Sequence, residues 1–145
     1  MKKVLTVCFL LLVLALSSQI GKFVSTSVIA GVDDLTTNSK IASMQVKFAE
    51  EINKQLPMQI DEATVLQSVT VLGTTLIYNY RLHYDAAAID KEYFLSEMQT
   101  SLSNGVCSTP EMVQVLEAGG KYLYSYLSQD NFNLGKVTFD ASSCR

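Results

Sequence analysis

The chain has 145 residues, 48% of them hydrophobic, which is the size and composition of one globular domain. Its formal net charge is −3, from 11 basic and 14 acidic residues. A mildly acidic chain without a basic cluster excludes the electrostatic pattern of a nucleic-acid-binding protein, and the apolar content excludes an intrinsically disordered chain.

Residues 1–17 have the form of a secretory signal peptide. Lys2 and Lys3 precede an apolar run of Val and Leu residues, and the small residues Ala15 and Ser17 suit cleavage after Ser17. Cleavage would remove both lysines and leave 9 basic against 14 acidic residues, a net charge of −5. We therefore expect a periplasmic or secreted protein.

The same segment has an alternative interpretation as an uncleaved anchor in the inner membrane. Residues 4–21 carry no charge, and their 18 residues are the lower limit for crossing a bilayer. Both interpretations place the rest of the protein outside the cytoplasm. Cys8 lies too early in the apolar run to be the acylated cysteine of a lipoprotein.

The composition changes at residue 39. Residues 18–38 are rich in Ser, Thr, Gly and Asp and are expected to form a flexible arm, which leaves residues 39–145 as a single domain. The domain should open with an amphipathic helix that Pro57 ends, because apolar residues recur at three and four residue steps. These residues are Ile41, Met44, Phe48, Ile52 and Leu56.

Two β-hairpins and two helices should follow. Residues 64–72 are rich in Val, Leu and Thr, residues 73–75 supply a turn, and residues 76–83 alternate in polarity, which predicts the first hairpin. Asp90 is placed to cap a helix that Asn104 and Gly105 would stop.

A short second helix should begin at Pro110, capped by Ser108 or Thr109, and end at Gly119 and Gly120. Residues 121–128 and 136–140 predict the second hairpin. The expected fold is α+β: an antiparallel sheet of about four strands, in two hairpins, with helices packed on one face.

All seven tyrosines lie in the stretch from Tyr78 to Tyr126, and tryptophan is absent. Tyrosines at alternate strand positions favour a packed core beneath the helices, with Tyr78 and Tyr80 on the inner face because Leu76 and Leu82 share it. Both faces of the second hairpin are apolar. The alternative for that hairpin is a binding surface formed by three tyrosines: Tyr122, Tyr124 and Tyr126.

The two cysteines outside the leader are Cys107 and Cys144. In an oxidising compartment they are expected to form one disulfide, which closes a loop of 38 residues and stabilises the fold by roughly 4 kcal/mol. A thiol nucleophile or a zinc site is the alternative, but no CxxC spacing occurs and there is a single histidine. The sequence predicts no metal and no cofactor.

His83 and Asp85 are the one pair that suggests catalysis, because a carboxylate can orient an imidazole as a general base. No nucleophile motif such as GxSxG accompanies them. We therefore expect no enzyme, and keep a hydrolase that uses His83 and Asp85 as an alternative.

Five short segments together give the chain a family resemblance: 78–80, 106–110, 118–120, 124–126 and Cys144. Over residues 57–145 it resembles small exported bacterial proteins without assigned activity, and its layout is more faintly similar to the disulfide-containing pilotin domains of type II secretion. The resemblance implies a periplasmic, disulfide-stabilised domain and no catalytic residue.

The leading functional hypothesis is a non-enzymatic exported interaction or accessory protein, which binds an unidentified protein partner through its sheet face or sheet edge. A membrane-anchored envelope protein is the second hypothesis. In the second case the membrane is also a partner, through residues 4–21.

Overall fold

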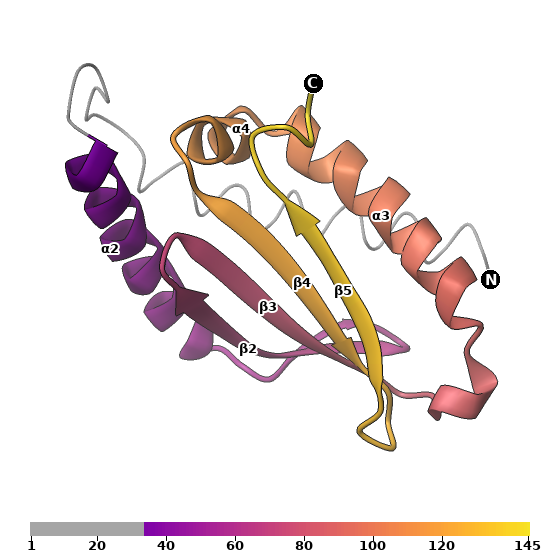
Figure 1. Cartoon of the computed structure of the whole chain (residues 1–145). Helices are drawn as coiled ribbons and strands as arrows, with labels where there is room; N and C mark the ends of the chain where they lie inside the picture. The colour runs from indigo at the N-terminus through magenta and orange to yellow at the C-terminus, as the bar shows by residue number, and fades with distance from the viewer. Residues whose placement is uncertain (1–33) are drawn as a thin grey trace.

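The computed structural model describes residues 34–145 (Figure 1). Three α-helices, one short 3-10 helix and five strands occur in this part of the chain. Their order is α2 (Asp34–Asn53), β1 (Met58–Asp61), β2 (Thr64–Leu72), β3 (Thr75–Leu82), η1 (Ala86–Ala88), α3 (Lys91–Ser108), α4 (Pro110–Glu117), β4 (Lys121–Leu127) and β5 (Asn133–Phe139). The predictions of a signal peptide, an anchor and most of the arm fall outside the described residues.

The fold is α+β, but the sheet is mixed and has five strands in the order β1-β2-β3-β4-β5. The prediction of an antiparallel sheet of about four strands is therefore wrong in its strand number and in one pairing. Strands β3 and β4 run parallel, with Tyr78 opposite Tyr124 and Tyr80 opposite Tyr126. The other three pairings are antiparallel.

The parallel pairing follows from the lengths of the helices between the two strands. Helix α3 has 18 residues and is about 27 Å long, which matches the length of about 26 Å of the eight-residue strand β3. It therefore returns the chain to the end of the sheet where β3 began, as Figure 1 shows. Helix α4, with 8 residues, is too short to run back again, so β4 starts beside the start of β3.

Strand β1 is the strand that the sequence analysis missed. It has only four residues and directly follows Pro57, where the predicted helix ends. The Asp61 carboxylate accepts a hydrogen bond from the Ala63 backbone N–H at 2.7 Å, which closes the tight turn into β2.

Helix boundaries also differ from the prediction at two places. Helix α2 begins at Asp34, so residues 34–38 are helical and do not belong to an arm. Helix α3 is capped by Asp90, whose side chain accepts from the Tyr93 N–H at 3.1 Å, but it continues past Gly105 to Ser108. Gly105 is buried and has no positive φ, so it is a packed helical residue and not a stop.

The turn between β4 and β5 is shorter than predicted, because β5 begins at Asn133 instead of at residue 136. The Ser128 hydroxyl accepts from the Phe132 N–H at 2.9 Å, and the Ser128 N–H donates to the Phe132 carbonyl at 3.0 Å. Asn131 sits between them with φ 64°, a conformation that asparagine tolerates. These bonds close the hairpin over five residues, 128–132.

All three α-helices pack on one face of the sheet, as the sequence predicts. One continuous core joins Phe48 of α2, Leu102 of α3 and Leu116 of α4 with the inward residues of the strands. Figure 1 shows α2 along one side of the sheet, α3 along the other, and α4 at the end where β4 begins. The opposite face of the sheet is not covered by any described helix.

Candidate functional site

The inner face of the central strands is an aromatic core. Tyr78 and Tyr124 stack with ring centroids 5.0 Å apart, and Tyr80 and Tyr126 with centroids 5.3 Å apart. The Phe94 ring meets Tyr126 edge-on at 5.1 Å. These distances lie in the range of favourable aromatic pairs, so the rings contribute to stability beyond the area they bury.

Burial contradicts the prediction that Tyr122, Tyr124 and Tyr126 form a binding surface. Their exposed fractions are 2%, 4% and 0%, so a partner cannot reach these rings in the folded protein. The core interpretation is confirmed for Tyr78 and Tyr80 as well. The reason is the parallel pairing of β3 with β4, which sets the tyrosines of both strands on one face.

Burial also raises the pKa of the core tyrosines well above its ordinary value. The phenols of Tyr78, Tyr80, Tyr124 and Tyr126 therefore stay protonated at physiological pH. A protonated, inaccessible phenol is neither a nucleophile nor a general base, so this cluster is structural.

The opposite face of the same strands is accessible. We call it the open face and define it by eight outward residues: Ile77, Asn79, Arg81, Leu123, Ser125, Leu127, Lys136 and Thr138. Lys136 and Thr138 are exposed and the other six are half-buried. Strand register places Ile77 beside Leu123 and Arg81 beside Leu127.

The charge of the open face is opposite to that of the chain as a whole. It carries Arg81 and Lys136 and no carboxylate, whereas the chain has 14 acidic residues. The Arg81 guanidinium donates to the Asn131 side-chain oxygen at 2.6 Å and so points toward the β4–β5 turn without losing its charge. Among the described residues the one ion pair joins Lys54 to Glu51, both on the other side of the sheet. The open face therefore has uncompensated positive charge around an apolar centre.

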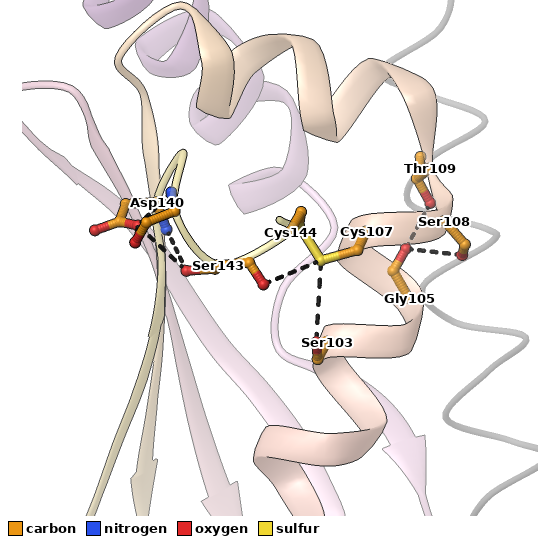
Figure 2. The surroundings of a disulfide bond; sticks show 9 residues. Ser103, Gly105, Cys107, Ser108, Thr109, Asp140, Ser143 and Cys144 are labelled. Atoms are coloured by element: carbon orange, nitrogen blue, oxygen red, sulfur yellow. Dashed lines mark hydrogen bonds between the residues drawn. A yellow bond between two sulfur atoms is a disulfide. The ribbon is translucent and has the colours of Figure 1, made fainter.

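Cys107 and Cys144 are joined by a disulfide, with Cα atoms 5.3 Å apart (Figure 2). Cys107 is in the last turn of α3, and Cys144 is in the tail that follows β5. The Ser103 hydroxyl lies 3.9 Å from the Cys107 sulfur. The hydroxyl is the donor in this contact, because a disulfide sulfur carries no proton. A thiol nucleophile is not available in this oxidised state.

The tail that carries Cys144 is shaped by Asp140. Its carboxylate accepts from the Ser142 hydroxyl at 2.6 Å and from the Ser142 N–H at 2.9 Å. The Asp140 N–H in turn donates to the Ser143 hydroxyl at 3.0 Å. The Ser142 hydroxyl and N–H hold the pKa of Asp140 below its ordinary value, with a smaller contribution from Lys121.

His83 and Asp85 do not form a catalytic arrangement among the described residues. Both are exposed just beyond β3, and no hydrogen bond joins their side chains. The His83 backbone N–H donates to the Ala63 carbonyl at 2.8 Å, which fixes the backbone but leaves the imidazole in solvent. The described residues also contain no cluster of His, Cys, Asp or Glu that could hold a metal ion.

A shallow hollow lies beside the tail. It is lined by Gly119, Gly120, Lys121, Asp140 and Arg145, among others. Charges of both signs meet there, and the C-terminal, negative end of the α4 dipole faces it. The hollow therefore does not favour an anionic ligand, and the open face is the stronger candidate site.

The sequence analysis expected binding through a sheet face or sheet edge, but it did not identify the residues of the open face. The available signal was the position of Leu123 and Leu127 beside Ile77 and Arg81 of β3. This arrangement could not be recognised from the sequence without knowing that β3 and β4 pair in parallel.

Residues 40–137, more than half of the chain, match the family described as "Domain of unknown function (DUF8479)". A curated relative, Protein K of Escherichia coli, is 32% identical over 73 residues, which cover 50% of this chain and 39% of that protein. The match thus spans about two fifths of the length of that relative.

Three solved structures share the fold. A candidate secreted protein from Pseudomonas aeruginosa has a TM-score of 0.67 and 27% identity, over 79% of this chain and 100% of that chain. The type 2 secretion pilotin EpsS from Vibrio vulnificus has a TM-score of 0.65 and 13% identity, over 76% and 96% of the two chains. The type II secretion pilotin AspS from Vibrio cholerae has a TM-score of 0.59 and 17% identity, over 76% and 97%.

No helix within residues 34–145 is both long and apolar enough to cross a membrane.

Proposed function

The chain belongs to the DUF8479 family, and we propose that it is an exported, non-enzymatic accessory protein that binds a protein partner through the open face of its sheet. The observation that carries this proposal is the contrast between the two faces of one sheet. The inner face is filled by stacked rings, and the open face presents Ile77, Leu123 and Leu127 among polar and basic side chains.

Export is supported by three independent features. The leader has the composition of a signal peptide, the domain contains a disulfide, and one structural neighbour is a candidate secreted protein. A disulfide persists in an oxidising compartment and is rare in the cytoplasm. We therefore assign the mature protein to the periplasm or the extracellular space.

An accessory role is supported by the fold and by the chemistry that the described residues offer. Two of the neighbours are pilotins of a secretion system, at identities that concern the fold alone. The core tyrosines are protonated and buried, Cys107 and Cys144 are bonded, and His83 and Asp85 are separate and exposed. These residues therefore form no assembled acid, base or nucleophile.

Site-specific photocrosslinking in the producing cell tests the proposal. A benzophenone side chain would be placed at Thr138 on the open face and, as matched controls, at Gln114 on α4 and at Lys47 on α2, which are also exposed. We expect a discrete protein adduct from position 138, identified by mass spectrometry, and none from positions 114 and 47. Adducts from the two helix positions with none from position 138 would contradict the proposal.

A further inference from the structure

We infer that the partner segment that docks on the open face is an amphipathic helix whose apolar stripe is flanked by carboxylates. This inference rests on the proposed function and adds the chemistry of the partner. It is carried by the shape of the face, by its apolar centre and by the sign of its charge.

The size of the face limits what can dock on it. The three strands of the open face, spaced about 4.8 Å apart and about 23 Å long, present roughly 330 Å². A standard interface between two folded proteins buries about 800 Å² on each partner. The open face alone is therefore too small for a folded domain and matches a single helix about 10 Å in diameter.

The apolar centre lies where such a helix would pack. Ile77 and Leu123 are register partners on the two central strands, and Leu127 continues the apolar surface along β4. All three are half-buried by their strand neighbours, so their remaining exposed area is available to a partner. Ser125 lies between Leu123 and Leu127, and its small side chain lets a helix approach the backbone closely.

The charges on the two sides of this centre select the partner. Arg81 lies beside Leu127, and Lys136 lies opposite Ser125 on the edge strand β5. Neither forms an ion pair with a described carboxylate. A helix with carboxylates on both flanks of its apolar stripe would pair with both cations, whereas a basic helix would meet like charge. Lys121 is less available, since Asp140 lies close enough to interact with it.

The preference of the open face for an acidic over a basic ligand can be tested, because it is opposite to what the net charge of the whole chain, −3, would favour. Long-range attraction to an acidic protein would favour a basic ligand. Preference for an acidic ligand therefore has to come from a local surface such as the open face. An anionic membrane surface would share this preference for Arg81 and Lys136, so the experiment includes a lipid arm.

The probe is a fluorescent synthetic peptide that forms an amphipathic helix of leucines flanked by glutamates, measured by anisotropy against the full-length exported protein. A second peptide replaces every glutamate with lysine, and vesicles of phosphatidylglycerol form the lipid arm. We expect the glutamate peptide to bind more tightly than the lysine peptide and to weaken as salt is added. Tighter binding of the lysine peptide, or vesicle binding without peptide binding, would overturn the inference.

Matched variants locate the site. The double variant Arg81→Glu with Lys136→Glu should weaken the glutamate peptide roughly tenfold, which corresponds to about 1.4 kcal/mol. The control Lys40→Glu with Lys47→Glu makes the same change in net charge on the exposed side of α2 and should change the affinity less than about twofold.

Because Arg81 also holds the β4–β5 turn through Asn131, a second variant leaves that contact intact. Ser125→Glu adds a carboxylate at the centre of the face and should weaken the same peptide without removing any hydrogen bond. Equal binding by the open-face variants and the α2 control would overturn the inference. Crosslinks from Thr138 that persist in that case would show that the proposed function stands and that only the acidic-helix partner is wrong.

Discussion

The two faces of strands β3 and β4 differ in role: the inner face is buried in the core, and the open face is accessible to a partner. Tyr78 and Tyr124 stack on the inner face at 5.0 Å, whereas Asn79 and Ser125, one residue further along each strand, are paired on the open face. Neighbouring residues in one strand therefore serve different purposes, because successive side chains point to opposite faces. A substitution at one position should change folding, and a substitution at the next should change binding.

The inner face depends on every layer that covers it. Helix α3 lies against β5 and is tied to the tail by the disulfide, and α2 covers the side of β2. No described helix covers the open face, whose side chains are positioned by the strands and, at Arg81, by the β4–β5 turn. The following substitutions, in order of decreasing effect, would break or sharpen this contrast.

Tyr124→Ala should destabilise the protein by about 3 to 5 kcal/mol, because it leaves a cavity between the Tyr78 ring and the Phe139 ring. Ser125→Ala, its neighbour on the open face, should change the free energy of unfolding by less than about 0.5 kcal/mol. Urea denaturation of both variants measures the difference. Equal effects of the two substitutions would mean that the inner face is not the core.

Cys107→Ser should lower stability by about 2 to 5 kcal/mol, because the unfolded chain is no longer restrained by the bond to Cys144. The effect should reach the inner face through α3 and leave the open face intact. Unfolding curves of the variant and of the reduced wild type should agree with one another. Wild-type stability in the variant would show that the bond contributes nothing to holding the helical layer.

Gly135→Ala should cost about 1 to 3 kcal/mol, because a Cβ at this inner-face position of β5 would lie 2.6 Å from the Leu95 side chain of α3. The backbone there has φ +138°, which a side chain disfavours further. Lys136→Ala, the adjacent open-face residue, is the matched control and should be close to neutral in thermal unfolding. A neutral Gly135→Ala would mean that α3 does not press on this strand.

Asp140 gives the smallest of these effects, since its carboxylate is exposed. Its pKa is lowered in the folded protein, mainly by the Ser142 hydroxyl, so its contribution to stability is present above the ordinary Asp pKa of about 3.9. The contribution is lost as pH falls through the lower folded-state pKa. Asp140→Asn should therefore be slightly less stable than wild type at neutral pH, with the difference vanishing in acid. A difference independent of pH would contradict this origin.

Local sequence signals predicted most of the elements. The Asp90 cap, Pro110 in the first turn of α4 and the alternation in β3 each depend on residues close in the chain. The stack of tyrosines was also predictable as core, because Leu76 and Leu82 share a strand face with Tyr78 and Tyr80.

Pairing direction and surface assignment were harder to predict. The direction of β4 depends on α3 matching the length of the sheet while α4 does not, and the expected stop at Gly105 concealed the full length of α3. Both faces of β4 are apolar in sequence, so alternation alone could not show that Tyr124 is covered and Leu123 is open. Which face of β4 is buried depends on the register with β3 and on packing against helices distant in the chain.

The central claim is that the open face binds a protein and the inner face does not. The most direct test combines a photocrosslinker at Thr138 with the double substitution Ile77→Gln and Leu123→Gln, using Val46→Gln on the exposed side of α2 as the control. We predict that the double variant loses the crosslinked adduct while its melting temperature stays near wild type, and that Val46→Gln keeps the adduct. An undiminished adduct from a folded double variant would contradict the claim.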